Sequence, residues 1–410
     1  MQTRLADFLQ GTPEGEEAAA ILGRCVHCGF CTATCPTYQL LGDELDGPRG
    51  RIYLIKQVVE GAEPTAKTQL HLDRCLGCRG CETTCPSGVE YGRLLDIGRR
   101  LVAERVPRSA GARLARVALR EGLTGSLFPA AMRAGRALRP LLPAALREQV
   151  PPRRAAGAWP RRSHVRKALL LAGCVQPAMM PNVNAATARV LDRLGIETIV
   201  PEAAGCCGAI RQHLEDPDGG LVDARRNIDA WWPHVEAGAE AVVMNASGCG
   251  SMVREYGHLL RHDADYADKA ARISAMTRDL AEWVPGLLAA SGTAVARGPG
   301  GRVAFHPPCS LQHGQRVKGA VEALLDSLGV EVVPFADAHL CCGSAGTYSL
   351  LQPALSRQLR DRKLDALNAA RPDVILSANI GCVAHLGTAA TVPVRHWIEW
   401  LDERLAASAA

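Results

Sequence analysis

The first hundred residues contain two cysteine runs that share one spacing. The first run reads Cys25-Val26-His27-Cys28-Gly29-Phe30-Cys31-Thr32-Ala33-Thr34-Cys35-Pro36. The second run reads Cys75-Leu76-Gly77-Cys78-Arg79-Gly80-Cys81-Glu82-Thr83-Thr84-Cys85-Pro86. Both follow the order Cys-x-x-Cys-x-x-Cys-x-x-x-Cys-Pro, which is typical of bacterial ferredoxins. The spacing predicts two [4Fe–4S] clusters rather than structural zinc, which usually takes two separated Cys-x-x-Cys pairs.

The same spacing predicts how the eight thiolates are shared. Three cysteines two residues apart can hold three corners of a cubane, and the fourth ligates the other cluster. We therefore assign the first cluster to Cys25, Cys28, Cys31 and Cys85. The second cluster takes Cys75, Cys78, Cys81 and Cys35. The long gap between the runs has helical character over residues 51–60, which favours a mainly helical ferredoxin module.

Three other polar residues lie close to these runs in the sequence. His27 is read as a solvent-facing loop residue, with a metal ligand or proton relay as the alternative. Arg49 and Arg51 could support a cluster or a carboxylate of a partner, or could simply belong to a helix-entry turn.

The second half of the chain is an internal repeat, and repeats of this kind determine the fold. Cys174, Cys206-Cys207-Gly208 and Cys249 recur as Cys309, Cys341-Cys342-Gly343 and Cys382, at offsets of 135, 135 and 133 residues. The flanking sequences also match, since residues 190–196 resemble residues 324–330.

Each copy alternates short apolar runs with helix-period stretches. Strands are expected at 168–171, 196–200 and 241–244 in the first copy, and at 302–305, 330–335 and 374–376 in the second. Gly195 and Gly329 follow predicted helices as C-terminal caps. The alternation predicts a parallel sheet in each copy. Cys174, Cys249, Cys309 and Cys382 would then follow strands, at the sheet edge where α/β proteins bind ligands.

The repeated cysteines resemble the cysteine-rich (CCG) domain of heterodisulfide reductases and related membrane-associated oxidoreductases. That family's pattern ends in Cys-x-x-Cys and can hold a non-cubane [4Fe–4S] cluster or zinc. Here the last cysteine is missing, and Met252 and His385 stand in its place. The four thiols left in each copy would suffice for zinc or an ordinary cluster, and His385 could be a ligand or a surface residue. The other reading is that these thiols are buried and bind no metal.

His306 lies three residues before Cys309. It could support the second site by hydrogen bonding or could simply be packed in the core. Asn245 and Asn379 could orient loops without touching a cofactor.

Composition and charge limit further which class of protein this chain can belong to. The chain has 410 residues and sixteen cysteines, and its N-terminus carries acidic residues and no apolar stretch of the signal-peptide kind. No apolar run approaches the ~18 residues of a membrane span. We expect a cytoplasmic protein, in which dense cysteine indicates metal binding or redox chemistry.

Residues 101–166 are strongly basic, with fourteen arginines against three acidic residues, a net charge of +11. Basic amphipathic helices there could bind a membrane surface or an acidic partner. The alternative is a helical linker that packs on the chain's own domains. Nothing else in the sequence is typical of nucleic-acid binding.

No dinucleotide-binding glycine motif follows a predicted strand, and no Walker A motif occurs. The chain should therefore pass single electrons for a flavoprotein partner. The layout resembles the iron–sulfur subunits of anaerobic glycerol-3-phosphate dehydrogenase, the lactate-utilisation proteins and the glycolate oxidase (glycolate dehydrogenase) iron–sulfur subunit. Residues 25–56 and 71–88 look most like the last of these families.

That resemblance implies a complex with two FAD-binding-type flavoprotein subunits that oxidises glycolate, with D-lactate as a further candidate. FAD would sit on the partners only, and electrons would go to a membrane quinone or another acceptor. This chain would have no catalytic residue and would associate peripherally with the cytoplasmic membrane. A heterodisulfide-reductase-like thiol–disulfide enzyme is the alternative from another class.

The predicted organisation has four parts, which together make a multidomain protein. Residues 1–100 form a mainly α-helical two-cluster domain, and residues 101–166 an Arg-rich helical linker. Residues 167–300 and 301–410 form two duplicated α/β CCG domains with parallel sheets.

Overall fold

The computed structural model describes residues 1–143, 147, 150–296 and 301–407. The chain divides into two units. The helical unit comprises Met1–Arg116, His213–Glu215 and His339–Lys363. The sheet unit comprises Val117–Gln212, Asp216–Ala338 and Leu364–Ala410. The division into four domains at the predicted boundaries stays a prediction.

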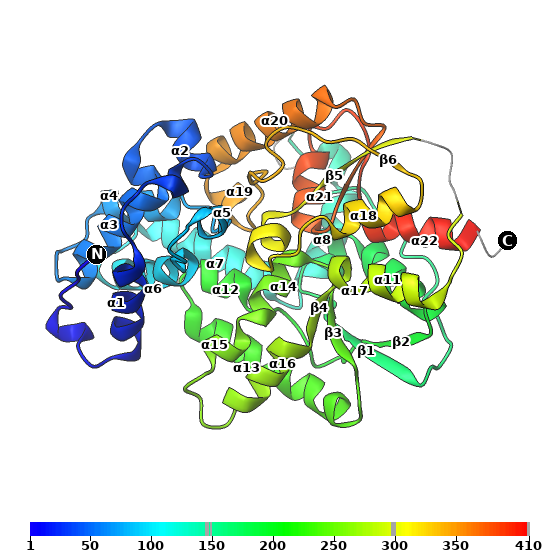
Figure 1. Ribbon diagram of the computed structural model, residues 1–410, viewed down its shortest axis with the longest axis horizontal. Helices are drawn as coiled ribbons and strands as arrows, with labels where there is room; N and C mark the ends of the chain where they lie inside the picture. The colour runs from blue at the N-terminus through cyan, green and yellow to red at the C-terminus, as the bar shows by residue number, and fades with distance from the viewer. Residues whose placement is uncertain (144–146, 148–149, 297–300, 408–410) are drawn as a thin grey trace. The chain divides into compact units, whose positions relative to one another are not determined.

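The helical unit contains short helices joined by cysteine-bearing loops (Figure 1). In chain order its elements are η1 (Asp7–Leu9), α1 (Pro13–Arg24), η2 (Phe30–Thr32), α2 (Pro36–Leu41), η3 (Glu44–Asp46), α3 (Pro48–Val59), α4 (Ala66–Asp73), α5 (Gly80–Thr84), α6 (Tyr91–Arg105) and α19 (Tyr348–Leu351). Helices α7 (Ala110–Thr124) and α20 (Pro353–Ala369) begin in this unit.

Several of these helices begin where the sequence carries a start signal. Pro13, Pro36 and Pro48 each occupy the first helical position, where the missing N–H costs nothing. Helix α4 begins with a capping box, in which the side chains of Thr65 and Thr68 each accept a bond from the other's backbone N–H.

Helices α1, α3 and α6 enclose the core of the helical unit. Ile21, Leu22, Ile55 and Leu94 are each at most 1% exposed. Burying one such side chain stabilises the fold by ~1.5–3 kcal/mol. Gly98 lets α3 and α6 approach, since a Cβ there would lie 2.5 Å from a side-chain carbon of Ile55.

The first sheet belongs to the sheet unit and has the order β2-β1-β3-β4, with every pair parallel (Figure 1). Its strands are β1 (Arg166–Leu170), β2 (Ile196–Ile199), β3 (Ala241–Met244) and β4 (Thr277–Asp279). Leu169, Leu170, Val242 and Val243 on the two central strands have no exposed area. Strands buried on both faces are expected of a parallel sheet covered by helices.

Helices connect these strands and extend before and after them. They are α8 (Phe128–Ala137), η4 (Arg139–Leu141), α10 (Gln176–Met179), α11 (Pro181–Arg193), α12 (Ala209–His213), α13 (Pro217–Glu236), α14 (Ser247–Arg254), α15 (Tyr256–Leu259), α16 (Ala267–Met276) and α17 (Leu280–Ser291).

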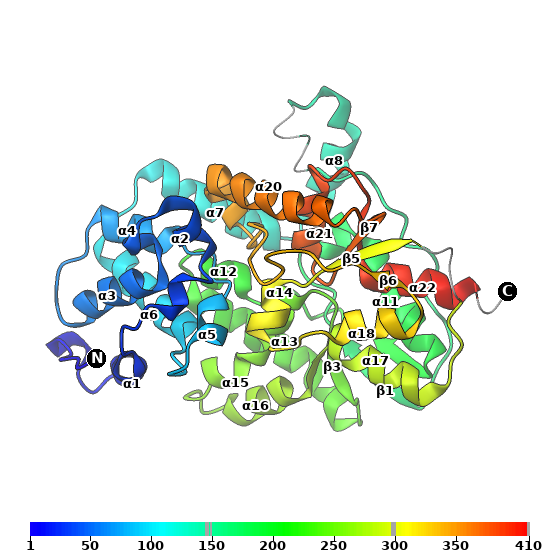
Figure 2. The same cartoon turned by 45° about the horizontal axis from the view of Figure 1, so that its top comes forward.

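The second sheet repeats this topology with the order β6-β5-β7-β8, again all parallel (Figure 2). Its strands are β5 (Arg302–His306), β6 (Glu331–Val332), β7 (Val374–Ser377) and β8 (Val394–His396). The accompanying helical segments are η5 (Ser310–Gly314, a π-helical turn), α18 (Ala320–Ser327), α21 (Ile380–Gly387) and α22 (Trp397–Ala407). The prediction of two duplicated parallel-sheet domains after a helical region is confirmed.

The two copies pack against each other within the sheet unit. Ser247 donates its backbone N–H to the carbonyl of Ala378, and its hydroxyl lies 2.7 Å from that of Ser310. Asp402 on α22 bonds to both Arg189 and Arg193 on α11 at 2.7–2.8 Å. Pairs of this kind fix the register of one copy on the other.

The Arg-rich segment makes ion pairs within each unit. In the helical unit, Arg108 and Arg116 both contact Asp73, at 2.7 and 3.0 Å. In the sheet unit, Glu121 accepts from Arg120 and Arg211 at 2.8 and 2.9 Å. These contacts favour packing on the protein for the arginines concerned.

The same segment also exposes apolar side chains, because Leu114 is 69% and Leu127 79% exposed. Within the described ranges, no helix combines the length and the apolar character that crossing a bilayer requires.

Candidate iron–sulfur and cysteine-rich sites

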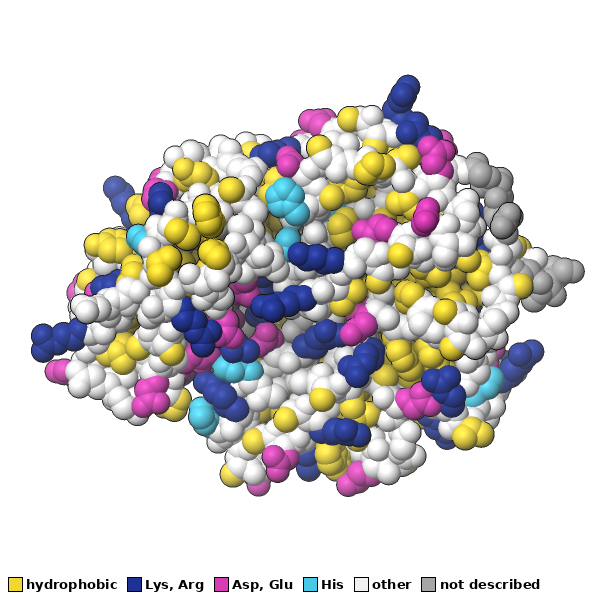
Figure 3. Space-filling model, viewed as in Figure 1, with side chains coloured by type: hydrophobic (Ala, Val, Ile, Leu, Met, Phe, Trp, Pro, Cys, Tyr) yellow, Lys and Arg dark blue, Asp and Glu magenta, His cyan; other side chains and the backbone are white. Residues whose placement is uncertain are grey.

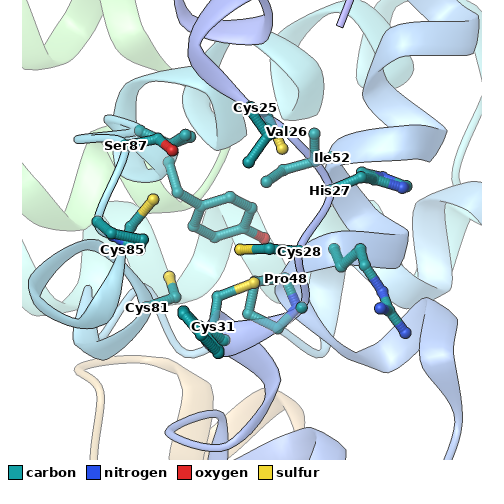
Figure 4. Close-up of a pocket in the computed structure, with 16 residues that line it drawn as sticks. Cys25, Val26, His27, Cys28, Cys31, Pro48, Ile52, Cys81, Cys85 and Ser87 are labelled. Carbon is teal, nitrogen blue, oxygen red and sulfur yellow. The ribbon is translucent and has the colours of Figure 1, made fainter.

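The first cysteine run wraps around a small cavity in the helical unit. Cys25 ends α1, and the chain then turns through left-handed residues at His27 (φ 58°) and Gly29 (φ 85°) before η2. Figure 4 shows the sulfur atoms of Cys25, Cys28 and Cys31 turned toward the same space. The left-handed turns let three thiols two residues apart face inward together.

Two further thiols at this cavity, those of Cys81 and Cys85, come from the second run. Cys85 lines the cavity with the first-run cysteines (Figure 4). Burial raises the pKa of Cys31 to about 11, and the charges of Cys25, Cys85 and Cys28 raise it further. The structure thus brings Cys25, Cys28, Cys31 and Cys85 together.

The other four N-terminal cysteines form a second group. Burial holds the pKa of Cys81 well above its ordinary value, and the neighbouring charges of Cys78, Cys75 and Cys35 act in the same direction. Cys35 comes from the first run, where it precedes α2. Cys35, Cys75 and Cys78 therefore lie near Cys81, which also lines the cavity of the first run. The division of the eight cysteines into two ligand sets stays a prediction.

The chemistry of these donors fits the predicted clusters. None of the sixteen cysteines, all of which are described, forms a disulfide. Burial and the neighbouring thiols raise the pKa of Cys31 and Cys81, so free thiolates are unfavourable at these positions. A bound cation would offset the repulsion between neighbouring thiolates. Soft thiolate donors in sets of four select iron–sulfur clusters or zinc. The assignment of each cysteine to a cluster remains our proposal.

The two groups differ in their surroundings. Cys28 of the first group is exposed, and its neighbours Val26 and Phe30 are 69% and 62% exposed. Figure 3 shows hydrophobic side chains at the surface over helices α2 to α5. In the second group, Cys35, Cys75 and Cys81 are all buried.

The polar residues near the first run also differ in position. His27 is exposed, with its ring 6.1 Å from that of Tyr53. Arg49 pairs with Glu44 at 2.6 and 3.0 Å. Arg51, by contrast, is only 1% exposed.

Arg51 is a buried cation beside the second group. Burial by itself lowers the pKa of the guanidinium, but Cys75, Tyr91, Cys35 and Asp46 outweigh it and hold the pKa above its ordinary value. Arg51 therefore keeps its charge inside the helical unit.

The first cysteine-rich copy brings its four thiols together inside the sheet unit. Cys174 follows β1, Cys206 and Cys207 precede α12, and Cys249 lies in the first turn of α14. Hydrogen bonds from Cys174 and Cys207 lower the pKa of Cys206, and the N–H of Gly208, 3.4 Å from its sulfur, acts in the same direction. The hydrogen bond with Cys206 raises the pKa of Cys207, and a further thiol hydrogen bond that joins Cys207 to Cys249 acts in the same direction.

Two buried side chains hold the Cys-Cys turn in this copy. Asn227 donates to the carbonyl of Cys206 at 2.7 Å, and Tyr256 donates to that of Cys207 at 2.8 Å. Gly208 has φ 91°, and a Cβ there would lie 2.7 Å from the carbonyl oxygen of Gly220. The turn therefore requires glycine after the cysteine pair.

The position of the missing fifth cysteine is apolar in the first copy. Met252 is 9% exposed and packs in the core with Val253 and Tyr256. In the second copy, His385 is half-buried on α21, three residues after Cys382.

The cysteines of the second copy are divided between the units. Cys309 follows β5, and Cys382 lies in α21 of the sheet unit. There the buried ring of His306 comes within 4.8 Å of the Cys382 sulfur, and Asn379 donates to that sulfur at 3.6 Å. Cys341 and Cys342 belong to the helical unit, where the N–H of Gly343 lies 3.4 Å from the Cys341 sulfur. A site formed by all four thiols stays a prediction.

The sequence did not point to several side chains that contact these thiols or their turns. Thr37 and Tyr91 approach sulfur atoms of the second group, and Asn227 and Tyr256 hold the Cys-Cys turn. Each is distant in sequence from most of the thiols of its site. Spacing patterns within the chain gave no signal for them.

Two protein families match the chain. The family described as 4Fe–4S dicluster domain matches residues 21–89, and the family described as cysteine-rich domain matches residues 168–254 and 303–387. These matches identify an iron–sulfur protein with one dicluster domain followed by two cysteine-rich domains.

Curated relatives narrow this class. The chain is 53% identical over 411 aligned residues to the glycolate oxidase iron–sulfur subunit of Escherichia coli K12, covering 99% of each protein. It is 30% identical to the probable glycolate oxidase iron–sulfur subunit of Bacillus subtilis 168, covering 93% of this chain and 90% of that one. Lactate utilization protein A of Geobacillus thermodenitrificans is 30% identical over 58% of this chain and 99% of its own length. The chain belongs to the family of glycolate oxidase iron–sulfur subunits.

Proposed function

We propose that this chain is the electron-transfer subunit of a flavin-dependent 2-hydroxy acid dehydrogenase complex. Glycolate is the first candidate substrate and D-lactate the second. The observation that carries the proposal is the clustering of the N-terminal cysteines within one helical unit, with Cys85 near Cys31 of the first run and Cys35 near Cys81 of the second. Bound there, each [4Fe–4S] cluster would accept and release one electron at a time.

The chain's own residues would hold these clusters and control their surroundings. Cys35 and Cys85 would each ligate the cluster of the other run, which ties the two runs into one folding unit. The first group lies beside exposed residues, so it is the more accessible of the two to another subunit.

The partners belong to the same proposal. Two FAD-binding-type subunits would oxidise the hydroxy acid and pass its electrons singly to this chain. The final acceptor would be a membrane quinone, reached from the cytoplasmic face of the membrane. This chain would bind no substrate itself.

Cysteine substitutions in the purified complex test the relay. Cys28→Ser and Cys78→Ser should each remove one iron–sulfur EPR signal and stop acceptor reduction. Ser87 lines the same cavity as Cys28 but carries no thiol, so Ser87→Ala should leave both signals in place. Full acceptor reduction by a double cysteine variant that lacks both signals would rule out the relay.

The first cysteine-rich site would hold a further metal centre, either zinc or an iron–sulfur cluster. Its four hydrogen-bonded thiols form a donor set suited to both. Metal analysis of the chain and of a Cys206→Ala variant tests this. The variant should lose zinc, or about four irons, while both N-terminal signals remain. An unchanged metal content would contradict it.

A thiol–disulfide reductase is the second candidate function. Hydrogen bonding lowers the pKa of Cys206, which favours a nucleophilic thiolate. Reduction of a disulfide substrate by the isolated chain and a chemical electron donor, with no flavoprotein present, would support this candidate. Loss of that activity in Cys206→Ala would then locate it.

A further inference from the structure

A buried tyrosine touches one thiol of the second cysteine group. The hydroxyl of Tyr91 donates toward the sulfur of Cys75 across 3.6 Å, and Tyr91 is 3% exposed. The backbone N–H of Gly77 approaches the same sulfur at 3.5 Å. Hydrogen bonds to a ligating thiolate withdraw negative charge from it and stabilise the more negative, reduced state of a cluster.

A buried arginine is linked to a second thiol of this group through the hydroxyl of a threonine. Arg51 donates from Nη1 to the hydroxyl of Thr37 at 3.2 Å, and that hydroxyl lies 3.3 Å from the sulfur of Cys35. Nε of Arg51 donates to the carbonyl of His71 at 2.7 Å. These bonds hold the guanidinium in one place, next to the sulfur shell of the predicted cluster.

Arg51 shares its acidic partner with a second arginine. Asp46, with no exposed area, is the acidic partner of Arg51 at 3.4 Å and also of Arg74 at 2.8 Å. Two guanidiniums share the Asp46 carboxylate, and the carboxylate of the exposed Asp43 lies within 4.8 Å of it, so Arg51 is the buried cation nearest the second group. A buried positive charge interacts strongly with a nearby cluster because little water screens it.

The first group has no equivalent arrangement. In the part of the chain that the structure describes, no side-chain hydroxyl bonds to the sulfur of Cys25, Cys28, Cys31 or Cys85. The nearest arginine, Arg49, is half-buried and already paired with Glu44 at 2.6 Å. The ring of Tyr91 also lines the cavity of the first group, but its hydroxyl bonds to Cys75, and the Thr37 hydroxyl that Arg51 contacts lies beside Cys35, so both effects are directed at the second group.

We propose that Tyr91 and Arg51 are positioning residues that raise the reduction potential of the second cluster, held by Cys35, Cys75, Cys78 and Cys81. The inference rests on the proposed function, because it needs the two clusters to be present. It assigns each residue a separate effect, Tyr91 through a hydrogen bond to sulfur and Arg51 through charge.

Tyr91→Phe is the main test, with Tyr53→Phe as its matched control. Tyr53 lies on α3 of the same unit, is 46% exposed and has its ring near His27 rather than a thiol. The readout is an EPR-monitored redox titration of the intact complex. Cys28→Ser and Cys78→Ser assign each signal to its cluster.

Tyr91→Phe should lower the midpoint potential of the second cluster and leave that of the first unchanged. Tyr53→Phe should move neither potential. Unchanged potentials in Tyr91→Phe with both clusters assembled would overturn the role of Tyr91, as would equal shifts of both clusters.

Arg51→Gln and Arg51→Lys test the charge. The glutamine variant should lower the potential of the second cluster, and the lysine variant should keep most of it. Thr37→Val, with Thr34→Val as control, removes the hydroxyl between Arg51 and Cys35 without removing the charge. An unchanged potential in a folded Arg51→Gln variant would overturn the role of Arg51. If that variant fails to fold, Arg74→Gln removes the other guanidinium from Asp46 and should also lower the potential of the second cluster. An unchanged potential there would overturn the effect assigned to the buried charge.

Failure of the proposed function would look different. A wild-type chain without two cluster signals would remove the basis of the relay itself. A wild-type chain with both signals, and potentials that do not respond to Tyr91 or Arg51, would overturn this inference alone.

Discussion

Cys85 is the residue that distinguishes interleaved clusters from clusters built within each run. Its side chain lines the cavity of Cys25, Cys28 and Cys31, although it lies in the second run. Cys85→Ser should therefore weaken the EPR signal that Cys28→Ser removes, and spare the one that Cys78→Ser removes. The opposite pattern would mean that each run holds its own cluster.

Gly208 should tolerate no side chain. It combines φ 91° with a carbonyl oxygen 2.7 Å from the place of a Cβ. Backbone strain costs ~1–2 kcal/mol and overpacking a further ~1–3 kcal/mol, so Gly208→Ala should lower the free energy of unfolding by about 2–5 kcal/mol. Gly195, at φ 76° with open space around it, is the control. Chemical denaturation of both variants compares them, and equal losses would contradict the steric argument.

His396 should make the protein sensitive to acid. Burial lowers its pKa from 6.5 to about 4, so the folded state keeps the ring neutral. Because the pKa of His396 is lower in the folded than in the unfolded state, protonation favours the unfolded state. The folded state therefore has its full free energy of unfolding above pH 6.5 and loses part of it as the pH falls toward 4. His396→Asn keeps an acceptor for the N–H of Ile398, which bonds to Nδ1 at 3.3 Å.

Between pH 7 and pH 5, the wild type should lose about 2 kcal/mol more unfolding free energy than His396→Asn. Urea denaturation at the two pH values measures this difference. The exposed His262→Asn should lose as much as the wild type. An equal loss in His396→Asn would contradict the pKa shift.

At the scale of elements, Asp46 joins three parts of the helical unit. It lies at the end of η3 and contacts Arg51 on α3, His71 on α4 and Arg74 just after α4. Asp46→Asn leaves a buried guanidinium without a counter-charge, which costs about 3–5 kcal/mol. Glu14→Gln breaks the exposed pair with Arg100 and should cost less than about 1 kcal/mol. Thermal unfolding ranks the two variants, and similar losses would mean that the buried pair is not structural.

The strands show which elements a sequence can reveal. The apolar runs at 168–171, 241–244 and 374–376 predicted β1, β3 and β7 closely. The edge strands β4 (Thr-Arg-Asp) and β8 (Val-Arg-His) were missed, because three residues with a central arginine carry no apolar pattern. A strand was predicted over 330–335, but the structure has only the two-residue strand β6 there, at the edge of its sheet.

The helix ends were more predictable than the edge strands. Gly195 and Gly329 were expected as C-terminal caps, and both have the positive φ that this role requires, at 76° and 75°. A cap depends on local backbone geometry, so its signal lies in one residue. An edge strand depends on pairing with a distant segment.

At the scale of the whole chain, the grouping of thiols was more accessible to sequence reasoning than their surroundings. Cysteine spacing is local, so two runs were enough to predict a grouping of the eight thiols. The hydroxyl of Tyr91 reaches Cys75 from sixteen residues away, and Asn227 reaches Cys206 from twenty-one. Such contacts follow from the packing of helices, which no spacing pattern encodes.

The most direct test of the central claim is EPR spin quantitation, together with iron analysis, on the reduced full-length chain within its complex. Two [4Fe–4S] clusters predict about two spins and at least about eight irons per chain. Cys28→Ser and Cys78→Ser should each remove about one spin. A reduced wild-type complex with no cluster signal, or with zinc alone at the eight N-terminal cysteines, would contradict the account.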